Sequence, residues 1–228
     1  MLVRDWMSTD VITINSTDTI MEAINRLMDH DISMLPVLED SRLVGIVTDR
    51  DLKHALPSDA CLLDFQNIMY HVSRQQVATI MTRNPITVPT DLTIEEVAEI
   101  LLEKKISGVP VTDAQGGIKG IITKADIFKA MIALTGWSHR GFLFGFELED
   151  RPGSIQEVTD ILRNYGQRLV SIVGTYEGAA EGYRAVSIRV FDVDRNTLPQ
   201  LEKDLQAIAR LLYIFDMRHN TRKYFPIP

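Results

Sequence analysis

The sequence predicts a mixed α/β and α+β chain: two βαββα repeats packed as a pseudo-twofold pair, followed by a ferredoxin-like βαββαβ domain. Three observations predict this fold class. The stretch GIVTDRD at residues 45–51 recurs as GIITKAD at 120–126. Around each copy the apolar residues alternate between strand and helix periodicity. From Trp137 onward the pattern no longer follows the repeat.

The duplication covers far more than one motif. ISMLPV at 32–37 matches ISGVPV at 106–111, an offset of 74 residues, and one extra residue in the turn DAQGG raises the offset to 75. Self-similarity of this length indicates duplicated structural units. We therefore expect repeat 1 at about 2–56 and repeat 2 at about 77–134, joined by a packed connector at 57–76.

Each repeat has the same predicted order of elements. A short β-branched strand comes first, and a helix follows in which Thr19 and Glu22, or Thr93 and Glu96, have the spacing of a capping box. Two more strands and a closing helix complete the order strand, helix, strand, strand, helix. A unit of about 50 residues buries too little surface to be stable alone. We therefore expect the two repeats to share a core within residues 1–135.

The last third of the chain has its own pattern. GFLFGFELED alternates as a half-buried strand, Ser154 begins a helix and Gly166 ends it. Two strands joined by EGAAEG, a helix from about Leu198 to Arg210, and a closing strand follow. The order βαββαβ over 141–218 is that of a ferredoxin-like sandwich, and residues 219–228 remain as a tail.

Composition excludes several classes of protein. Apolar residues make up 45% and charged residues 24%, as in globular proteins, and the net charge of −7 argues against a nucleic-acid partner. Cys61 is the only cysteine, which excludes an intrachain disulfide and a cysteine-rich metal site. The N-terminus has no signal-peptide pattern, and no apolar run approaches the roughly 20 residues of a membrane span. We expect a cytoplasmic protein without a membrane partner.

The repeated Thr-x-x-Asp motif allows two interpretations. In the first, Thr48 with Asp51 and Thr123 with Asp126 are helix-opening caps that need no ligand. In the second, the same helix start binds an anion, the carboxylate accepts the hydroxyls of a ribose, and the threonine hydroxyl donates to a phosphate. The preceding Gly45 and Gly120 would then allow close backbone approach.

The doubled hhPV…GhhTxxD pattern, from about Leu2 to Leu134, resembles the CBS domain, which occurs in tandem pairs. The resemblance implies a regulatory module that binds adenine nucleotides in two clefts between the copies. It does not indicate which cleft is occupied. It implies one cleft formed by Thr123 and Asp126 with Ile32 and Ser33, and a second formed by Thr48 and Asp51 with Ile106 and Ser107. Arg50 and Lys124 would neutralise phosphate if they face the clefts; the alternative is that they are solvated helix residues.

The stretch LEDRPGSIQEVTDILRNYGQRLVSI is similar to the opening of the ACT domain, an amino-acid-sensing module, over about Gly141 to Arg218. The resemblance implies a loop at a dimer interface that can bind an amino acid. The alternative is that Pro152-Gly153 is only a tight turn. The order CBS, CBS, ACT resembles the acetoin-utilisation proteins of the AcuB type, although acetoin itself does not follow from any residue. The loop that the resemblance implies consists of Asp150, Arg151, Pro152, Gly153, Ser154 and Ile155.

No pattern of catalytic residues is present. The sequence lacks a nucleophile elbow, a phosphate-binding lysine loop and paired histidines at ligand spacing. We therefore expect a non-enzymatic sensor with no catalytic cofactor and no metal, which binds AMP, ADP, ATP or S-adenosylmethionine, forms a homodimer and acts on a partner enzyme. The alternative is a structural subunit with vestigial clefts that recruits a metabolic enzyme. The nucleotide, the partner and the pathway stay open.

Overall fold

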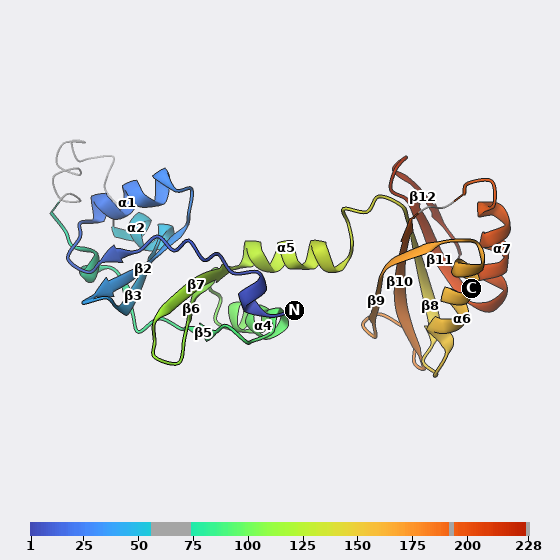
Figure 1. Cartoon of the computed structure of the whole chain (residues 1–228), viewed down its shortest axis with the longest axis horizontal. Coiled ribbons are helices and arrows are strands. Elements are labelled where there is room, and N and C mark those ends of the chain that lie inside the picture. Colours follow the sequence, from blue (N-terminus) through green and yellow to red (C-terminus); the bar gives the residue numbers. More distant parts are fainter. Residues whose placement is uncertain (56–73, 192–193, 227–228) are drawn as a thin grey trace. The chain divides into compact units, whose positions relative to one another are not determined.

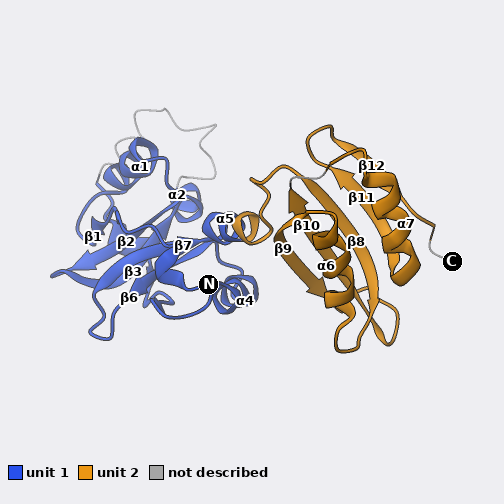
Figure 2. Cartoon of the chain, turned by 45° about the vertical axis from the view of Figure 1, so that its right-hand side comes forward, with its two compact units in different colours: residues 1–130 blue, residues 131–228 orange. Residues whose placement is uncertain are grey.

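The computed structural model describes residues 1–55, 74–191 and 194–226 (Figure 1). The chain divides into two compact units, Met1–Ala130 and Met131–Pro228 (Figure 2). Most of the predicted connector, including Cys61, lies outside the described residues.

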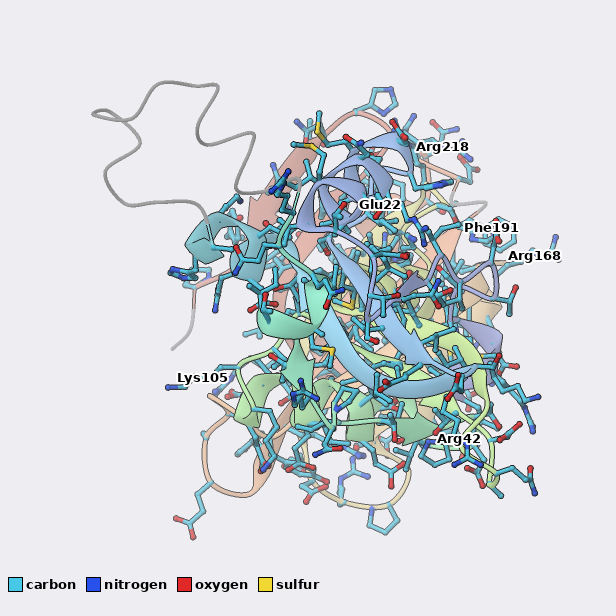
Figure 3. The ribbon with its side chains drawn as sticks, turned by 90° about the vertical axis from the view of Figure 1, so that its left-hand side faces the viewer. Glu22, Arg42, Lys105, Arg168, Phe191 and Arg218 are labelled. Carbon is cyan, nitrogen blue, oxygen red and sulfur yellow. The ribbon has the colours of Figure 1, made fainter. Side chains whose placement is uncertain are left out.

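The predicted order of strand, helix, strand, strand and helix occurs twice in unit 1. Both helices after the first strands begin at the predicted threonine: Thr19 and Thr93 each accept the amide of the glutamate three residues on. Glu22, labelled in Figure 3, accepts the Thr19 amide and hydroxyl in return, and these hydrogen bonds lower its pKa. The elements are β1 (Ile14–Asn15), α1 (Ile20–Asp29), β2 (Met34–Glu39), β3 (Arg42–Thr48) and α2 (Asp49–Ala55), then β5 (Val88–Pro89), α4 (Ile94–Glu103), β6 (Gly108–Thr112), β7 (Ile118–Thr123) and α5 (Lys124–Leu134).

The first residues of each repeat pack in the core of the other repeat, an arrangement called here the exchange. Val77 and Met81, which begin repeat 2, are buried in the core of repeat 1, whereas Val3 is buried in the core of repeat 2. The exchange is matched in hydrogen bonds: the Val77 amide donates to Asp18 O at 2.8 Å, and the Val3 amide donates to Leu92 O at 2.9 Å. Each hydrophobic core is therefore incomplete without the other repeat, which is how two small units share a core.

The exchanged segments also add hydrogen-bonded residues to the sheet of the other repeat. β4 (Thr82–Arg83), from the start of repeat 2, pairs with β3 of repeat 1 and gives the sheet order β1-β2-β3-β4. In repeat 2 the order is β5-β6-β7, and Ser8 forms an antiparallel bridge to Ile121 of β7. The short helices η1 (Val3–Asp5) and η2 (Val77–Thr79) precede these contacts in matching positions.

Gly45 and Gly120 lie directly against methionine side chains and not against open space. A Cβ built on Gly45 would lie 2.5 Å from Met81 Sδ, and one built on Gly120 would lie 2.7 Å from both Met7 Sδ and the Ser8 carbonyl oxygen. These distances are far below van der Waals contact. The two glycines therefore allow the exchanged segments to lie directly on the strands.

Replacing Gly120 by Ala should destabilise unit 1 by about 1–3 kcal/mol, because the added methyl group overlaps a backbone oxygen that cannot move aside easily. We would measure urea unfolding in a Trp137→Phe background, where Trp6, packed against the core of repeat 2, is the only tryptophan left. Gly174→Ala is the control, since its added Cβ would meet nothing closer than 3.7 Å. Equal unfolding midpoints for the two variants would contradict the packing argument.

Unit 2 contains one antiparallel sheet with the strand order β12-β11-β8-β10-β9. The first four strands in chain order thus adopt the arrangement 4-1-3-2 of a ferredoxin-like sandwich. Helices α6 and α7 pack on one face over a core that includes Phe144, Phe146 and Leu205. The elements are β8 (Phe142–Glu149), α6 (Ser154–Asn164), β9 (Arg168–Thr175), β10 (Tyr183–Phe191), α7 (Leu198–Ile208), β11 (Arg210–Asp216) and β12 (Thr221–Tyr224).

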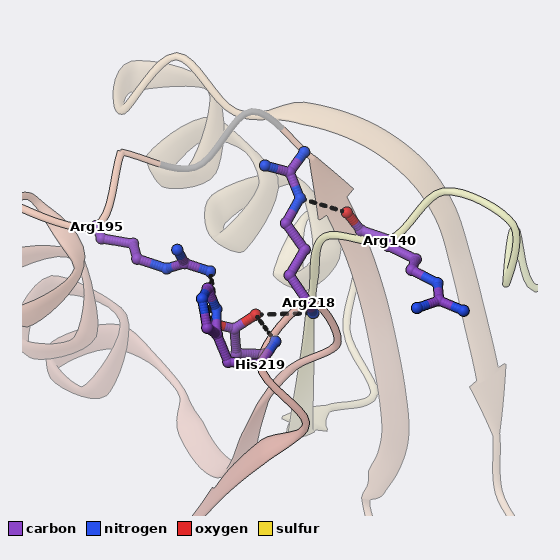
Figure 4. Close-up of polar contacts among 5 residues, drawn as sticks. Arg140, Arg195, Arg218 and His219 are labelled. Atoms are coloured by element: carbon purple, nitrogen blue, oxygen red, sulfur yellow. Dashed lines mark hydrogen bonds and ion pairs between the residues drawn. The ribbon is translucent and has the colours of Figure 1, made fainter.

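The sequence predicts a tail at 219–228, whereas residues 221–224 form β12 and pair with β11. The turn between these strands is held by Asp216, which is 8% exposed. Its Oδ1 accepts the amides of Arg218 and His219, and its Oδ2 accepts Arg195 Nη2 at 2.8 Å and lies 3.1 Å from His219 Nδ1 (Figure 4). Arg218 Nε also donates to the Arg140 carbonyl at 3.0 Å. Hydrogen bonds to the single carboxylate of Asp216 thus anchor the β11–β12 hairpin, which the sequence did not predict.

Burial opposes ionisation of Asp216, but the hydrogen bonds from His219, Arg218 and Arg195 outweigh it, so its pKa lies below the usual value. A depressed folded-state pKa contributes stability that is present above the unfolded value of about 3.9 and is lost as the pH falls through the folded value. We expect Asp216→Asn to cost about 1–3 kcal/mol at pH 7, and less near pH 3.

Thermal unfolding between pH 7 and pH 3, followed by Trp137 fluorescence in a Trp6→Phe background, would measure this difference. Asp160→Asn is the control, because that side chain is 50% exposed in its pair with Arg163. A cost that does not change with pH would show that Asp216 acts through shape and not through its charge.

Candidate functional site

The two Thr-x-x-Asp motifs have nearly the same local geometry. Asp51 Oδ2 accepts the Thr48 amide at 2.8 Å and the Thr48 hydroxyl at 2.7 Å. Asp126 Oδ2 accepts the Thr123 amide at 3.0 Å and the Thr123 hydroxyl at 2.7 Å. Each aspartate thus caps the amide and the hydroxyl of its own threonine, and at the first motif the Thr48 hydroxyl also accepts the Asp51 amide at 3.4 Å. One oxygen of each carboxylate is left for another partner.

A cavity of about 480 Å³ lies beside the first motif and takes residues from both repeats. Its volume is in the range of pockets that hold small organic ligands. Seven of the ten nucleotide-site residues expected from the sequence line it: Ser33, Thr48, Arg50, Asp51, Ile106, Ser107 and Lys124.

Backbone hydrogen bonds place each of the two serines beside the last helix of its own repeat. Asp49, the first residue of α2, donates its amide to the Ser33 carbonyl at 3.0 Å, and Lys124, the first residue of α5, donates to the Ser107 carbonyl at 2.9 Å. Each serine thus lies at the start of its own repeat's last helix. Ser33, which was expected beside Thr123 and Asp126, and Lys124 both line the cavity of the first motif.

Several lining residues are absent from the sequence-based prediction. Asn84, Pro85 and Ile86 reach the cavity because β4 pairs with β3, and Asn84 has a left-handed φ of 49°. Lys105, with φ of 55°, is in the turn before β6. The sequence signal for Lys105 was its position next to the predicted Ile106 and Ser107, whereas Asn84, Pro85 and Ile86 depend on the exchange between the repeats, which short-range patterns do not indicate. The apolar part of the wall consists of Met34, Ile46, Pro85, Ile86, Ile106, Val109 and Pro110.

The second motif is more enclosed than the first. Asp126 is 5% exposed, and its Oδ1 is 3.0 Å from Lys129 Nζ. Asp51 is partly exposed, lines the cavity, and has no further partner for Oδ1 among the described residues. Thr123 and Asp126 do not line the 480 Å³ cavity, and Ile32 packs against the core of repeat 1. The two expected clefts are therefore not equivalent.

A family model that describes the CBS domain matches residues 3–58 and 77–133. A CBS domain-containing protein of Dictyostelium discoideum is 32% identical over 132 residues, which cover 58% of this chain and 91% of that protein. The chain belongs to the CBS-domain family. Unit 1 is thus a tandem CBS pair, as the doubled motif indicates.

Two other similarities concern the CBS pair alone. Inosine-5'-monophosphate dehydrogenase of Korarchaeum cryptofilum is 37% identical over 119 residues, which cover 52% of this chain and 22% of that enzyme. The chain thus spans about a fifth of the length of that relative. The CBS domain pair of protein MJ0100, solved in complex with 5'-methylthioadenosine and S-adenosyl-L-methionine, is 35% identical over 57% of this chain and 95% of that one, with a TM-score of 0.49.

Outside the CBS pair, the predicted ACT loop begins at the end of β8. The Arg151 guanidinium donates to Glu149 at 2.9 Å and to Glu157 at 2.8 and 2.7 Å, and these contacts, those with Glu157 above all, raise its pKa. Gly153 has φ of 90°, which a residue with a side chain would adopt only with strain. Pro152-Gly153 thus forms the turn into α6 that the sequence allows as one interpretation.

The rest of the ACT loop contacts unit 2 itself. The Asp150 amide donates to the Gly182 carbonyl at 2.8 Å, Ser154 is buried and accepts Arg184 Nη2 at 3.2 Å, and Ile155 packs on the core. A cavity of about 370 Å³ is lined by Arg151 and Ser154 together with Glu147, Glu149, Glu157 and Arg210 among others. Its arginine and glutamate side chains already form ion pairs with one another.

Within the described ranges, no group of three histidine, cysteine or acidic side chains has the arrangement of a metal site. In the same residues, no helix is both long enough and apolar enough to cross a bilayer.

Asp126→Ala should cost about 1–3 kcal/mol of stability, because it removes an acceptor from two donors at a buried position and also breaks the Lys129 pair. Asp51→Ala should cost about 1 kcal/mol less, since the same donors at Thr48 remain accessible to water. Thermal unfolding followed by circular dichroism would measure both. Equal costs would mean that the second carboxylate is no more enclosed than the first.

Proposed function

We propose that this protein is a non-catalytic regulatory sensor, and that its CBS pair binds an adenine nucleotide or S-adenosylmethionine. The observation that supports it is the 480 Å³ cavity between the repeats, where Thr48 and Asp51 of one face Ile106 and Ser107 of the other. Membership of the CBS-domain family, to which residues 3–58 and 77–133 match, supports the same function.

The cavity offers a partner for each part of such a ligand. Asp51 is held in place by two hydrogen bonds and keeps Oδ1 for the hydroxyls of a ribose. The apolar wall formed by residues such as Ile46, Ile106 and Val109 can cover a purine ring. Arg50 and Lys124 are exposed cations that can neutralise phosphate. The cavity can thus bind a ribose whose base lies against the apolar wall and whose phosphate lies near Arg50 and Lys124.

Regulation follows if the ligand binds one arrangement of the protein more tightly than another, because only such a difference in affinity shifts a conformational equilibrium. We propose that residues 141–218 are an ACT-type domain that passes the change to a partner enzyme in the cytoplasm through a homodimer, in the AcuB-type order of domains. In this proposal the loop Asp150–Ile155 binds an amino acid at the dimer interface. Within one chain, Arg151 of this loop already pairs with Glu149 and Glu157.

The second candidate function is a structural subunit whose clefts are vestigial. The pairing of Lys129 with Asp126 favours it, because a ribose hydroxyl would have to compete with the lysine for Asp126 Oδ1. The two candidates differ in what Asp51 does. Replacing both Asp51 and Asp126 by Ala removes the response to nucleotide if the chain is a sensor, and leaves binding of the partner enzyme unchanged if the chain is a structural subunit.

Calorimetric titration with AMP, ADP, ATP, S-adenosylmethionine and 5'-methylthioadenosine tests the sensor. We expect at least one of them to bind more tightly than 1 mM, which corresponds to about 4 kcal/mol. Asp51→Ala should weaken that binding at least tenfold, because two charge-assisted hydrogen bonds to the ribose are lost. Glu103→Ala, an exposed carboxylate on α4 outside the cavity, is the control. Failure of all five compounds to bind would leave the structural subunit as the better candidate.

A further inference from the structure

The residues that line the first cavity and their equivalents in the alignment of the two repeats differ in charge. The offsets of 74 and 75 residues assign to each residue lining the first cavity an equivalent on the second side. Backbone geometry supports the alignment: Lys105 and its equivalent Asp31 both have left-handed φ, of 55° and 51°. The same turn thus carries a cation in repeat 2 and a carboxylate in repeat 1.

The first cavity is lined by three cations and two carboxylates, and its net charge is therefore +1. The Asp49 carboxylate also pairs with Lys53 at 3.0 Å, which weakens its repulsion of an anion. Coulomb attraction between exposed charges favours a ligand with phosphate over one without it. The charged lining residues are Arg50, Lys105, Lys124, Asp49 and Asp51.

The equivalent positions of the second cleft have the opposite sign. Ala125 takes the place of Arg50, Asp31 that of Lys105, and Asp10 that of Asn84. With Lys124 as the only cation at these positions, and with Asp49 and Asp126 as further carboxylates, the net charge is −3. An anionic ligand would be repelled where the first cavity attracts it.

Lys129 adds a direct block at the second motif. Its Nζ lies 3.0 Å from Asp126 Oδ1, so both oxygens of that buried carboxylate have partners from α5 and β7. The equivalent of Lys129 in repeat 1 is His54, which makes no hydrogen bond to Asp51 among the described residues. The lysine is 68% exposed, and a single exposed pair of this kind is weak. The block therefore depends on the burial of Asp126 and on the acidic surroundings as well.

We propose that each chain binds one ligand only, in the Thr48/Asp51 cavity, and that this cavity selects an adenosine ligand with a negatively charged phosphate group. The equivalent positions on the other side are acidic, and their carboxylate Asp126 is buried and paired with Lys129, so an anionic ligand does not bind there. This inference rests on the proposed function and adds to it the number of sites and the charge of the ligand.

Calorimetry with AMP, adenosine and S-adenosylmethionine on the full-length protein tests the proposal. We expect one AMP per chain, a dissociation constant for AMP at least tenfold lower than for adenosine or S-adenosylmethionine, and a clear weakening of AMP binding between 50 and 500 mM salt, at concentrations that change screening. Two AMP molecules per chain, or equal affinities for AMP and adenosine, would overturn it. If none of the three compounds binds, and ADP, ATP and 5'-methylthioadenosine do not bind either, the proposed function itself fails, which is a different result.

Single variants assign the site. Arg50→Ala and Lys105→Ala should each weaken AMP binding three- to tenfold and leave adenosine binding unchanged. Arg42→Ala, an exposed cation outside the cavity that is labelled in Figure 3 together with Lys105, is the matched control. Asp126→Asn should keep one AMP per chain with the same affinity. Loss of AMP binding in Asp126→Asn, with binding retained in Asp51→Ala, would place the ligand in the wrong cleft and refute the proposal.

Discussion

The exchange of N-terminal segments between the two repeats is the constraint on which unit 1 depends. Val77 and Met81 complete the core of repeat 1, and Val3 completes that of repeat 2. Because burial of apolar surface is the main favourable contribution to folding, neither half keeps its core when the other is removed. The exchange also brings Asn84, Pro85 and Ile86 beside Asp51. The same packing that stabilises the pair therefore forms the cavity between its halves.

Core packing and ligand binding place different requirements on the side chains of the two repeats. Equivalent residues of the two repeats make matching contacts, such as the hydrogen bonds of Val3 and Val77 and the glycines that face Met7 and Met81. The side chains at the clefts are not symmetric. Core positions must keep the same shapes in both repeats, since a packed interior tolerates little change of volume. Surface charges are under no such constraint, so one cleft can be cationic while its copy is acidic.

Unit 2 is a separate structural unit with its own apolar core. Its sheet is anchored at one end by Asp216, which closes the β11–β12 turn, and Arg168 stacks on Phe191 at 4.8 Å near the opposite edge (Figure 3). Arg189 is buried without a carboxylate partner among the described residues, and burial lowers its pKa. Its Nε donates to the Thr135 carbonyl at 2.6 Å, directly after α5 ends. Both residues belong to unit 2, so this contact lies within it.

The sequence by itself determined the duplication, the order of elements in both repeats, the capping boxes at Thr19 and Thr93, and the strand and helix order after Trp137. These features depend on local periodicity and on residues three positions apart, which a sequence displays directly. It also indicated Thr48 and Asp51 as a pair. Only the tertiary structure decided that the repeats exchange segments, that Asp51 borders a cavity while Lys129 pairs with Asp126, and that residues 221–224 form a strand. Those outcomes depend on contacts between residues far apart in the chain, and short-range patterns do not encode them.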